Sequence, residues 1–398
     1  MMRVPLLDLA DEYRALADPI REKIDKVVAS HSFILGPEVE NFESAICKYT
    51  GARYAVGMSS GTDALLATLM CLDIGPGDAV VTTAYSFFAN AACIARLGAM
   101  PIFVDIDAET LNISTTALED VLTTQCEQGA NSELYHKASG KRVRTIVPVH
   151  LFGLCCEIQA ICALAEKHGL RVIEDAAQAI GAECRIDSKT RRAGTIGLAG
   201  CFSFYPTKNL GAAGDAGMVI CNEEQFARKL AVCRQHGMER RYHHQFIGGN
   251  FRLDEIQAAV LNVKLPHLNE WSAARRAVAE FYRTEFKRTG LLDQVILPAD
   301  PYRECGIINH HIYHQFVIRT SARDALREHL TRHCIGTAIY YPLALHEQEC
   351  FAYLGHKAGD LPEAERAARE SLALPIYPTL SRDAQQYVVN TIKAFFKG

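Results

Sequence analysis

The sequence predicts an α/β protein with a mostly parallel sheet sandwiched by helices, followed by a smaller C-terminal α+β unit. Short apolar strands alternate with amphipathic helices between residues 54 and 221, a rhythm typical of parallel sheets. After about residue 295 this alternation gives way to a less regular mixture. At 398 residues the chain is too long for one ordinary core. We therefore expect an N-terminal segment plus a large domain over residues 1–250, and connecting helices plus a small domain over 251–398.

The composition, with 49% hydrophobic and 22% charged residues, is ordinary for a soluble globular enzyme. A net charge of −4 provides no basic field for nucleic acid or for an acidic membrane surface. No apolar run reaches membrane-spanning length, and the first residues lack the apolar core of a signal peptide. The 14 cysteines are scattered without a C-x-x-C pair. We expect reduced thiols in a cytoplasmic protein without a zinc site.

The first half of the chain contains most of the alternating pattern. Helical periodicity covers residues 12–29, and Pro37 stands at a plausible first position of the next helix. The pattern then predicts strands at 54–58, 79–82, 101–104, 144–149 and 171–174, and helices at 63–72, 88–97, 114–122 and 156–167. Residues 124–142 are polar and contain glycines, so we expect an exposed loop there.

The second half begins with a strand at 218–221 and a helix at 224–235, followed by a polar connector over 238–249. Two helices, 253–268 and 271–286, are separated near Pro266. In the smaller unit the pattern predicts strands at 312–318 and 335–340, and helices at 321–332, 362–371 and 382–396.

A single lysine precedes a glycine-rich run in the middle of the chain. Residues 200–203 read as a short apolar strand ending at Ser203, and Lys208 follows five residues later, before the glycines of 211–217. Poor solvation among aromatic and small residues disfavours the ammonium form and frees the amine as a nucleophile. These parts suit a lysine that forms a Schiff base with a cofactor aldehyde, with Ser203 near an anionic group. A surface lysine in a turn is the commoner alternative for a lone residue.

Further polar residues stand where predicted strands end, which is where parallel sheets bind ligands. Gly61 and Thr62 follow a strand and open a helix, so their backbone N–H groups suit a phosphate. The alternative is an ordinary helix cap.

Asp175 ends the strand 171–174, where its carboxylate suits the protonated ring nitrogen of pyridoxal 5′-phosphate. The alternative is that it caps a helix over 176–179. Gln178 projects from the same helix start, and either donates a hydrogen bond to the phenolic oxygen of that cofactor or lies on the surface.

Three other features have two interpretations each. Phe87 either stacks on a flat ring or belongs to the core. His150 ends a strand and is either a pocket residue or a structural histidine. The pairs 243–244 and 310–311 are adjacent histidines without Asp, Glu or Cys at ligand spacing, so we expect no metal site.

Taken together, these residues resemble the nucleotide-sugar aminotransferases of the DegT/StrS family, which are pyridoxal-phosphate enzymes of fold type I. The resemblance runs almost from end to end. It is carried by SSGTDAL (59–65), EDAAQAIGA (174–182), SFYPTKNLGAAGDAG (203–217) and GGNFRLDEIQAAVL (248–261), and more weakly by FILGPEVENFE (33–43) and PVHLFG (148–153). Residues 124–142 are longer than is usual in the family.

The resemblance implies a role for each matched position. Lys208 corresponds to the Schiff-base lysine and proton carrier, Asp175 to the partner of the pyridinium nitrogen and Gln178 to the phenolic-oxygen donor. The ring-stacking aromatic corresponds to Phe87, and the phosphate site to Gly61, Thr62 and Ser203.

A further position implies a second subunit. Asn250 corresponds to an asparagine that reaches the phosphate from the partner, so the active unit would be a homodimer. His150 and Arg252 lie in family motifs and are tentative substrate residues.

The expected activity is the transfer of an amino group from L-glutamate to a nucleotide-linked ketosugar. The Gln at position 178 associates with relatives that aminate a 3-keto hexose, whereas many that aminate a 4-keto sugar have His there. A 4-keto sugar aminotransferase is therefore the alternative. A sugar dehydratase of the same fold carries His in place of Lys208, and a non-catalytic regulatory protein would not need an intact set of cofactor residues.

Overall fold

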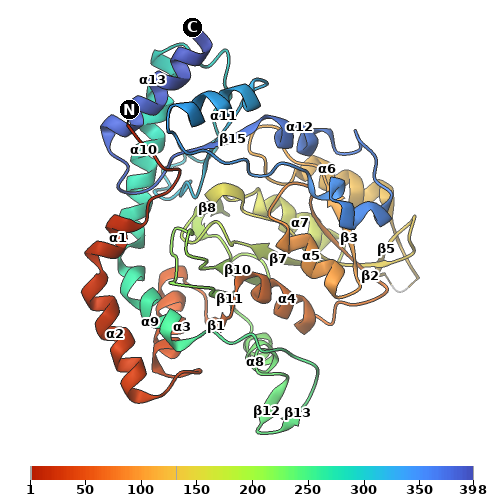
Figure 1. The fold of residues 1–398 in the computed structure, drawn as a ribbon. Helices are drawn as coiled ribbons and strands as arrows, with labels where there is room; N and C mark the ends of the chain where they lie inside the picture. Colours follow the sequence, from red (N-terminus) through yellow and green to blue (C-terminus); the bar gives the residue numbers. More distant parts are fainter. Residues whose placement is uncertain (1, 131, 398) are drawn as a thin grey trace.

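The computed structural model describes residues 2–130 and 132–397, and in this part of the chain the largest element is a nine-stranded sheet (Figure 1). Seven of its strands follow the order β1-β11-β10-β7-β6-β2-β3, and β4 and β5 join through β6. Their bounds are β1 (Tyr54–Met58), β2 (Asp78–Thr83), β3 (Met100–Val104), β4 (Cys126–Gln128), β5 (Leu134–His136), β6 (Arg142–Val147), β7 (Arg171–Asp175), β10 (Ala199–Ser203) and β11 (Gly217–Cys221).

The inner strands β3, β2, β6, β7 and β10 run parallel, which confirms the predicted mostly parallel sheet. β11 is antiparallel to both β10 and β1. Its register pairs Gly217 with Ser203 on one side and with Met58 on the other, while Asp175 pairs with Cys201. The ends of β1, β7 and β10 therefore meet the start of β11 at one edge of the sheet.

Helices cover both faces because successive strand residues point to opposite sides. Val81, Ile146 and Val172 pack with α3 (Pro37–Thr50), α6 (Thr115–Asp120), α7 (Ile158–Lys167) and α9 (Glu255–Lys264). Their sequence neighbours Val80, Val147 and Ile173 pack with α4 (Gly61–Cys71), α5 (Ala89–Arg96) and α8 (Glu224–Cys233). The two layers of helices seen in Figure 1 thus enclose the sheet, as the sequence predicts.

The smaller unit is built on α10 (Leu268–Arg288), α11 (Arg323–Arg332) and α13 (Arg382–Lys397), with α12 (Pro362–Glu370) beside them. A two-stranded antiparallel sheet joins β14 (Phe316–Arg319) to β15 (Ser371–Leu374). Val4 packs into this unit although it begins the chain, whereas α9 packs on the larger unit. The division at residues 250 and 251 stays a prediction.

The remaining elements are N-terminal helices, hairpins and helical turns. They are α1 (Ala10–Ala15), α2 (Ala17–Ser30), the hairpin strands β8 (Glu183–Ile186) and β9 (Lys189–Arg192), the hairpin strands β12 (Met238–Arg240) and β13 (His243–His244), the π-helical turn Val121–Gln125, and 3₁₀ turns at Leu151–Gly153, Leu265–His267, Leu345–Glu347 and Glu349–Leu354. The helix predicted at 12–29 is thus two helices meeting at Leu16, and the helix at 37 begins at Pro37 as expected.

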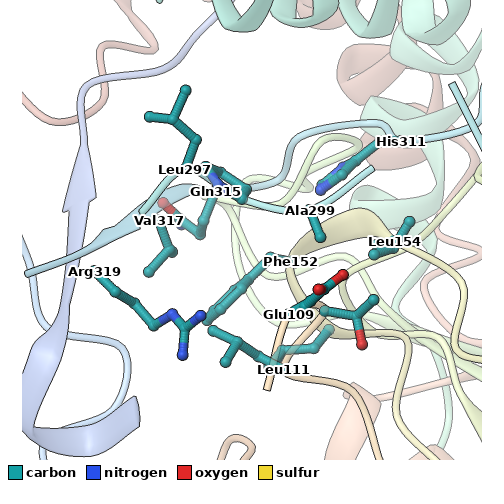
Figure 2. Close-up of a pocket in the computed structure, with 13 residues that line it drawn as sticks. Glu109, Leu111, Phe152, Leu154, Leu297, Ala299, His311, Gln315, Val317 and Arg319 are labelled. Carbon is teal, nitrogen blue, oxygen red and sulfur yellow. The ribbon is translucent and has the colours of Figure 1, made fainter. Parts of the chain in front are cut away.

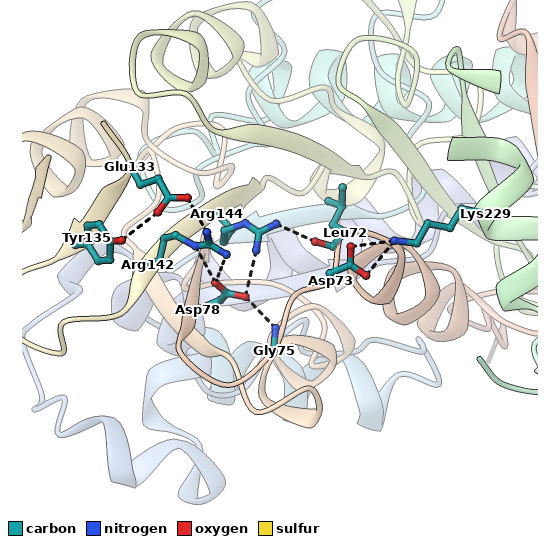
Figure 3. A network of polar contacts seen from close by, with 9 residues as sticks. All are labelled: Leu72, Asp73, Gly75, Asp78, Glu133, Tyr135, Arg142, Arg144 and Lys229. Carbon is teal, nitrogen blue, oxygen red and sulfur yellow. Dashed lines mark hydrogen bonds and ion pairs between the residues drawn. The ribbon is translucent and has the colours of Figure 1, made fainter. Parts of the chain in front are cut away.

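The prediction of an exposed loop over 124–142 was wrong for residues 126–128 and 134–136, which are strands. β4 and β5 form a hairpin that adds to the edge of β6, and Leu134 is buried. Ion pairs fix its polar residues: Arg142 Nη1 lies 2.6 Å from Glu133 Oε1, and Arg142 Nη2 lies 3.2 Å from Asp78 Oδ1 (Figure 3). Arg144 also pairs with Asp78. The charged residues that favour a loop in the sequence therefore form ion pairs that hold the hairpin against the sheet. Residue 131 lies outside the described residues.

Two further predictions were wrong. Residues 335–340 do not form a strand, because only single bridges tie Ile335 to Val4 and Ala338 to Ala373. Residues 176–179 form turns rather than a helix, since the Ala179 N–H bonds back three residues to the carbonyl of Ala176.

Candidate active site

A cavity of about 660 Å³ opens at the sheet edge where β1, β7 and β10 end. Its walls come from both units, which explains why residues far apart in the sequence meet there. The lining comprises Ser60, Gly61, Thr62, Leu65, Ser86, Phe87, Ala89, Asp175, Ala177, Gln178, Ser203, Tyr205, Thr207, Lys208, Asp215, His314, Gln315, Ile339, Tyr340 and Tyr341. Six residues predicted to bind a cofactor near Lys208 thus line one space with it.

Lys208 lies in the turn after β10, where its N–H donates to the carbonyl of Tyr205 at 2.8 Å. The turn needs Gly211, because a Cβ there would lie 2.3 Å from the carbonyl oxygen of Pro206. Burial lowers the pKa of Lys208 to about 8, although the carboxylate of Asp175 opposes that shift. At pH 7 about a tenth of the Lys208 amine is therefore neutral and nucleophilic, far more than for an exposed lysine.

Asp175 is the last residue of β7, and it lines the same cavity as Lys208. Its Oδ1 accepts a hydrogen bond from Ala177 N at 3.1 Å. Burial raises the pKa of Asp175, while this N–H and the positive charge of Lys208 act in the opposite direction. A cationic ring nitrogen placed beside the carboxylate would favour its ionised form.

The start of α4 forms a cradle of small and hydroxyl-bearing residues. Ser60 caps this helix by accepting from Asp63 N at 3.0 Å. A Cβ on Gly61 would lie 2.6 Å from Cβ of Ser203, so only glycine lets the helix start approach β10 this closely. With Thr62 next to it, the cradle offers backbone N–H groups and hydroxyls that suit a phosphate.

Phe87 and Gln178 stand on other sides of the cavity. Phe87 is 57% exposed, and its ring centroid lies 6.2 Å from that of Tyr341. Gln178 uses both ends of its amide: Oε1 accepts from Phe152 N, and Nε2 donates to the hydroxyl of Tyr341, each at 2.9 Å. Gln178 is thus neither a surface residue nor part of a helix.

His150 does not contact the cavity, which corrects the tentative prediction that it binds substrate. It is fully buried, and its Nδ1 accepts from Cys156 N at 3.1 Å. Its Nε2 lies 2.8 Å from Glu174 Oε2. Both ring nitrogens are therefore used within the protein, as the structural alternative expects.

Asn250 and Arg252 are absent from the lining of this cavity in the described chain. Asn250 forms a bridge with Gln235, and Arg252 with Met58 at the end of β1. The predicted roles of Asn250 and Arg252 therefore require that they contact the cavity of a second subunit.

Sequence reasoning missed the residues that the smaller unit contributes, above all His314, Gln315, Tyr340 and Tyr341. They come from irregular segments in which no strand end or helix start marks a site. Tyr340 and Tyr341 are held because the hydroxyl of Tyr85 accepts from Tyr341 N at 2.7 Å and donates to the carbonyl of Tyr340.

A second cavity, of about 20 Å³, lies behind the segment that carries His314. Gln315 lines both cavities, and Figure 2 shows it above Phe152, with His311 at the other end of the same segment. This space suffices for about one water molecule. It is part of the packing behind the site rather than a ligand pocket.

Within residues 2–130 and 132–397, no helix combines the length and the apolar character needed to cross a membrane. The same residues contain no group of three or more His, Cys, Asp or Glu side chains arranged to hold a metal ion.

Comparison with known proteins places these features in a family. The sequence profile of the DegT/DnrJ/EryC1/StrS aminotransferase family matches residues 15–393. A protein of Geobacillus stearothermophilus named "Pleiotropic regulatory protein" is 44% identical, covering 100% of this chain and 99% of the relative. The UDP-N-acetyl-3-dehydro-alpha-D-glucosamine 3-aminotransferase of Acidithiobacillus ferrooxidans is 38% identical over 99% and 98%. The crystal structure of S. venezuelae DesV in complex with a ketimine intermediate superimposes with a TM-score of 0.89, at 35% identity and 100% coverage of both chains.

Proposed function

Since the chain belongs to the DegT/DnrJ/EryC1/StrS aminotransferase family, we propose that it transfers an amino group from L-glutamate to a nucleotide-linked 3-keto hexose. The observation that carries the proposal is the position of Lys208, whose weakly basic amine shares a cavity with Asp175 and the Gly61 cradle. The fold is that of fold type I, in agreement with the sequence prediction.

The cavity residues fit pyridoxal 5′-phosphate. When bound, this cofactor supplies an aldehyde that takes up the amino group and a ring that stores electrons. Gly61, Thr62 and Ser203 would hold its phosphate, because their backbone N–H groups and hydroxyls converge where Gly61 permits close approach. The carboxylate of Asp175 would pair with the ring nitrogen and keep it protonated.

Lys208 would carry the proton during the reaction. Since burial lowers the pKa of this amine to about 8, about a tenth of it is neutral at pH 7. The neutral amine would accept a proton from the carbon next to the nitrogen of the amino donor and return it at the neighbouring position. Phe87, which lines the same cavity, would lie against the flat ring. The amide of Gln178 would serve the phenolic oxygen while it holds Tyr341.

The active unit in this proposal is a homodimer in the cytoplasm. Asn250 would reach the phosphate of the partner's cofactor, and Arg252 would face the partner's substrate, because neither lines the cavity of its own chain. The reduced state of all 14 cysteines agrees with a cytoplasmic location.

The choice of the third carbon rests on Gln178 and on the A. ferrooxidans relative, which is named as a 3-aminotransferase. The name of the G. stearothermophilus relative raises a regulatory role as an alternative. The set formed by Lys208, Asp175 and the cradle favours catalysis, since a protein that only senses a ligand has no need of a nucleophilic amine.

The test is a panel of matched 3-keto and 4-keto nucleotide sugars with glutamate as donor, the unstable 3-keto compounds being made in place by a coupled enzyme. Products are identified by mass and NMR. We expect a 3-amino product, and formation of 2-oxoglutarate in equal amount. A clear preference for the 4-keto compound would overturn the position of amination, and no transfer to any ketosugar would overturn the function.

A further inference from the structure

Tyr341 belongs to the part of the cavity wall that the smaller unit provides. It lines the cavity together with Lys208 and Gln178, and its hydroxyl lies 2.9 Å from Nε2 of Gln178. The proposed reaction gives a role to Gln178 but does not use the phenol of Tyr341. The cavity thus contains a polar group, in direct contact with a cofactor residue, whose hydrogen-bonding capacity is not yet accounted for.

The direction of this hydrogen bond follows from the backbone of Phe152. The Phe152 N–H can only donate, and it donates to Oε1 of Gln178 at 2.9 Å, which fixes the orientation of the amide. The atom of Gln178 that faces Tyr341 is therefore Nε2, which also can only donate. The oxygen of Tyr341 accepts this bond, and its own hydrogen stays available for another acceptor.

That hydrogen has no acceptor within residues 2–130 and 132–397. Burial raises the pKa of the Tyr341 hydroxyl, and the hydrogen bond from Gln178 opposes this shift. The hydroxyl therefore keeps its proton at physiological pH and is a neutral donor. Since a shielded O–H without an acceptor is unfavourable, a ligand that supplies an acceptor here gains affinity.

The ring of Tyr341 is held in place by its neighbours. Its backbone N–H donates to the hydroxyl of Tyr85 at 2.7 Å. The ring centroid of Tyr341 lies 6.0 Å from that of Tyr85, 5.7 Å from that of Tyr340 and 6.2 Å from that of Phe87. The donor is thus in position before a ligand arrives, which lowers the entropic cost of binding.

The acceptor that Tyr341 meets differs from the atom that Gln178 serves. The two N–H bonds of an amide group point about 120° apart, so the second hydrogen of Gln178 and the hydrogen of Tyr341 address separate atoms. In the proposed reaction Gln178 serves the phenolic oxygen of the cofactor, which is next to the aldehyde that takes up the amino group. Tyr341 is then available to the substituents of the carbon that carries this amino group.

Glutamate has a carboxylate on that carbon, and a carboxylate needs hydrogen-bond donors. Among the charged residues of the lining, Lys208 takes part in the reaction, and the carboxylates of Asp175 and Asp215 repel a further negative charge. His314 supplies no charge, because burial holds its pKa well below the usual value. A fixed, neutral O–H donor is therefore the group in this lining that suits the carboxylate.

We propose that the hydroxyl of Tyr341 donates a hydrogen bond to the α-carboxylate of the amino donor. Tyr341 is then a specificity-determining residue, which makes the site prefer an α-amino acid over an amine without this carboxylate. The inference rests on the proposed function, because it requires glutamate to react in the cavity of Lys208.

The test combines one substitution with one change of ligand, in the full-length protein with its cofactor bound. Tyr341→Phe keeps the ring and removes the hydroxyl, and 4-aminobutyrate is glutamate without its α-carboxylate. The reaction of each amine is followed by the change in cofactor absorbance in single turnovers, without any sugar. Tyr341→Phe should raise the half-saturating concentration of glutamate about 10- to 100-fold with little change in the maximal rate. That of 4-aminobutyrate should change by less than about threefold.

Tyr340→Phe is the matched control, because it removes the hydroxyl of the neighbouring tyrosine in the same lining. It should change neither half-saturating concentration by more than about threefold. An equilibrium readout comes from α-methyl-L-glutamate, which has no α-hydrogen to lose, and its dissociation constant should rise in Tyr341→Phe by the same factor as for glutamate. If Tyr341→Phe does not fold, Tyr341→Leu replaces it with the same expectation.

An unchanged half-saturating concentration of glutamate in folded Tyr341→Phe would overturn the inference. An equal rise for glutamate and 4-aminobutyrate, or an equal rise in Tyr340→Phe, would also overturn it, since neither depends on the α-carboxylate and the Tyr341 hydroxyl together. A rise confined to the ketosugar would place the hydroxyl on the sugar instead. Failure of the proposed function is distinguishable, because the unaltered protein would then not react with glutamate or would pass the amino group to no ketosugar.

Discussion

The imidazole of His150 donates from Nε2 to Glu174 Oε2 at 2.8 Å, and both side chains are fully buried. The same carboxylate accepts three backbone N–H groups, from Gly194 at 2.8 Å and from Ile196 and Gly197 at 2.7 Å each. Glu174 thus binds the loop before β10 to the end of β7, immediately beside Asp175. The pair sets the position of the strand that carries Asp175.

Glu174→Gln should destabilise the protein strongly. The amide group of Gln would face one of the N–H donors, so we expect a loss of about 3 kcal/mol in the free energy of unfolding. His150→Leu removes one of the four donors and should cost about 1–3 kcal/mol. Urea unfolding measures the free energy of unfolding of both variants. The control is Glu166→Gln on the exposed face of α7, which should change stability by less than about 0.5 kcal/mol. A raised KM in folded His150→Leu would argue that His150 does contact substrate.

Borohydride should attach the cofactor to Lys208. The purified protein should be yellow, and reduction should add the cofactor mass to the peptide that contains Lys208. Lys264 is buried under the rings of Tyr13 and Trp271, and its peptide should stay unmodified. Lys208→Ala should lower turnover by roughly 10³-fold or more, because it removes both nucleophile and proton carrier. Near-normal turnover in this variant would refute the assignment.

Substitutions of Gln178 and Tyr341 should have coupled effects on the free energy of unfolding. Gln178→Ala leaves the N–H of Phe152 without its acceptor and frees the hydroxyl of Tyr341, so it should cost about 1–3 kcal/mol of stability. Tyr341→Phe keeps the ring and removes only the hydroxyl. A double-mutant cycle should give a coupling of about 0.5–1.5 kcal/mol. Additive effects would mean that the hydrogen bond between the two side chains contributes nothing.

His311 should make stability fall in acid. Burial lowers its pKa to about 3, with Asp300 opposing and Arg283 and His310 assisting the shift. The unfolded chain binds this proton near pH 6.5 and the folded protein does not, so stability is full above pH 6.5 and is lost as pH falls toward 3. The slope reaches about 1.4 kcal/mol per pH unit.

The matched variant is His311→Asn, which keeps an acceptor for Tyr313 N but does not titrate. Unfolding free energies of both proteins at pH 7, 6, 5 and 4 give the difference between their slopes, and other titrating groups cancel. Parallel slopes would show that His311 is protonated in the folded protein or contributes no linkage.

Mixing two inactive variants should restore activity if Asn250 acts across the dimer. Lys208→Ala and Asn250→Ala are each impaired as homodimers. In a mixed dimer one site receives both defects, and the other receives an intact Lys208 and an intact Asn250 from the partner. Co-expression with two different affinity tags isolates this species, which should have about half the activity of the unaltered dimer. Absence of complementation would place Asn250 in its own site.

The sequence predicts the larger unit well because its alternating pattern reflects burial on two faces. Strands ending at Asp175 and Ser203 and a helix start at Gly61 locate one edge of the sheet, and family motifs name the residues. The wrong predictions share one cause, because each depends on contacts between segments that are far apart in the sequence. Residues 335–340 have a strand-like pattern, yet their partners Val4 and Ala373 offer only single bridges. The charges of 124–142 indicate solvent, but Asp78 and Glu133 neutralise their arginines.

The same limitation applies within the site. The predicted strand 144–149 ends at Val147 in the structure, and His150 follows it in an irregular segment. The direction of its ring depends on Glu174 and Cys156, which no spacing reveals. His314, Tyr340 and Tyr341 reach Lys208 only because the smaller unit folds back over the sheet edge. The sequence alone does not distinguish these three residues as site residues, since polar and aromatic residues of the same kinds occur throughout the chain.

The pairing of Val4 with Ile335 has a consequence for biosynthesis. The described ends of the chain lie on the same side of the molecule (Figure 1). Val4 and Ile335 are separated by more than 300 residues, so Val4 lacks this partner until residue 335 has been synthesised. At about 5–20 residues per second this delay is on the order of tens of seconds. During that time α1 and α2 lack much of their packing surface, including Ala212, to which the Tyr13 hydroxyl donates at 3.0 Å. Chaperones that bind nascent chains should therefore associate with the first thirty residues, and a bulky fusion at the N-terminus should lower the yield of folded enzyme more than one at the C-terminus.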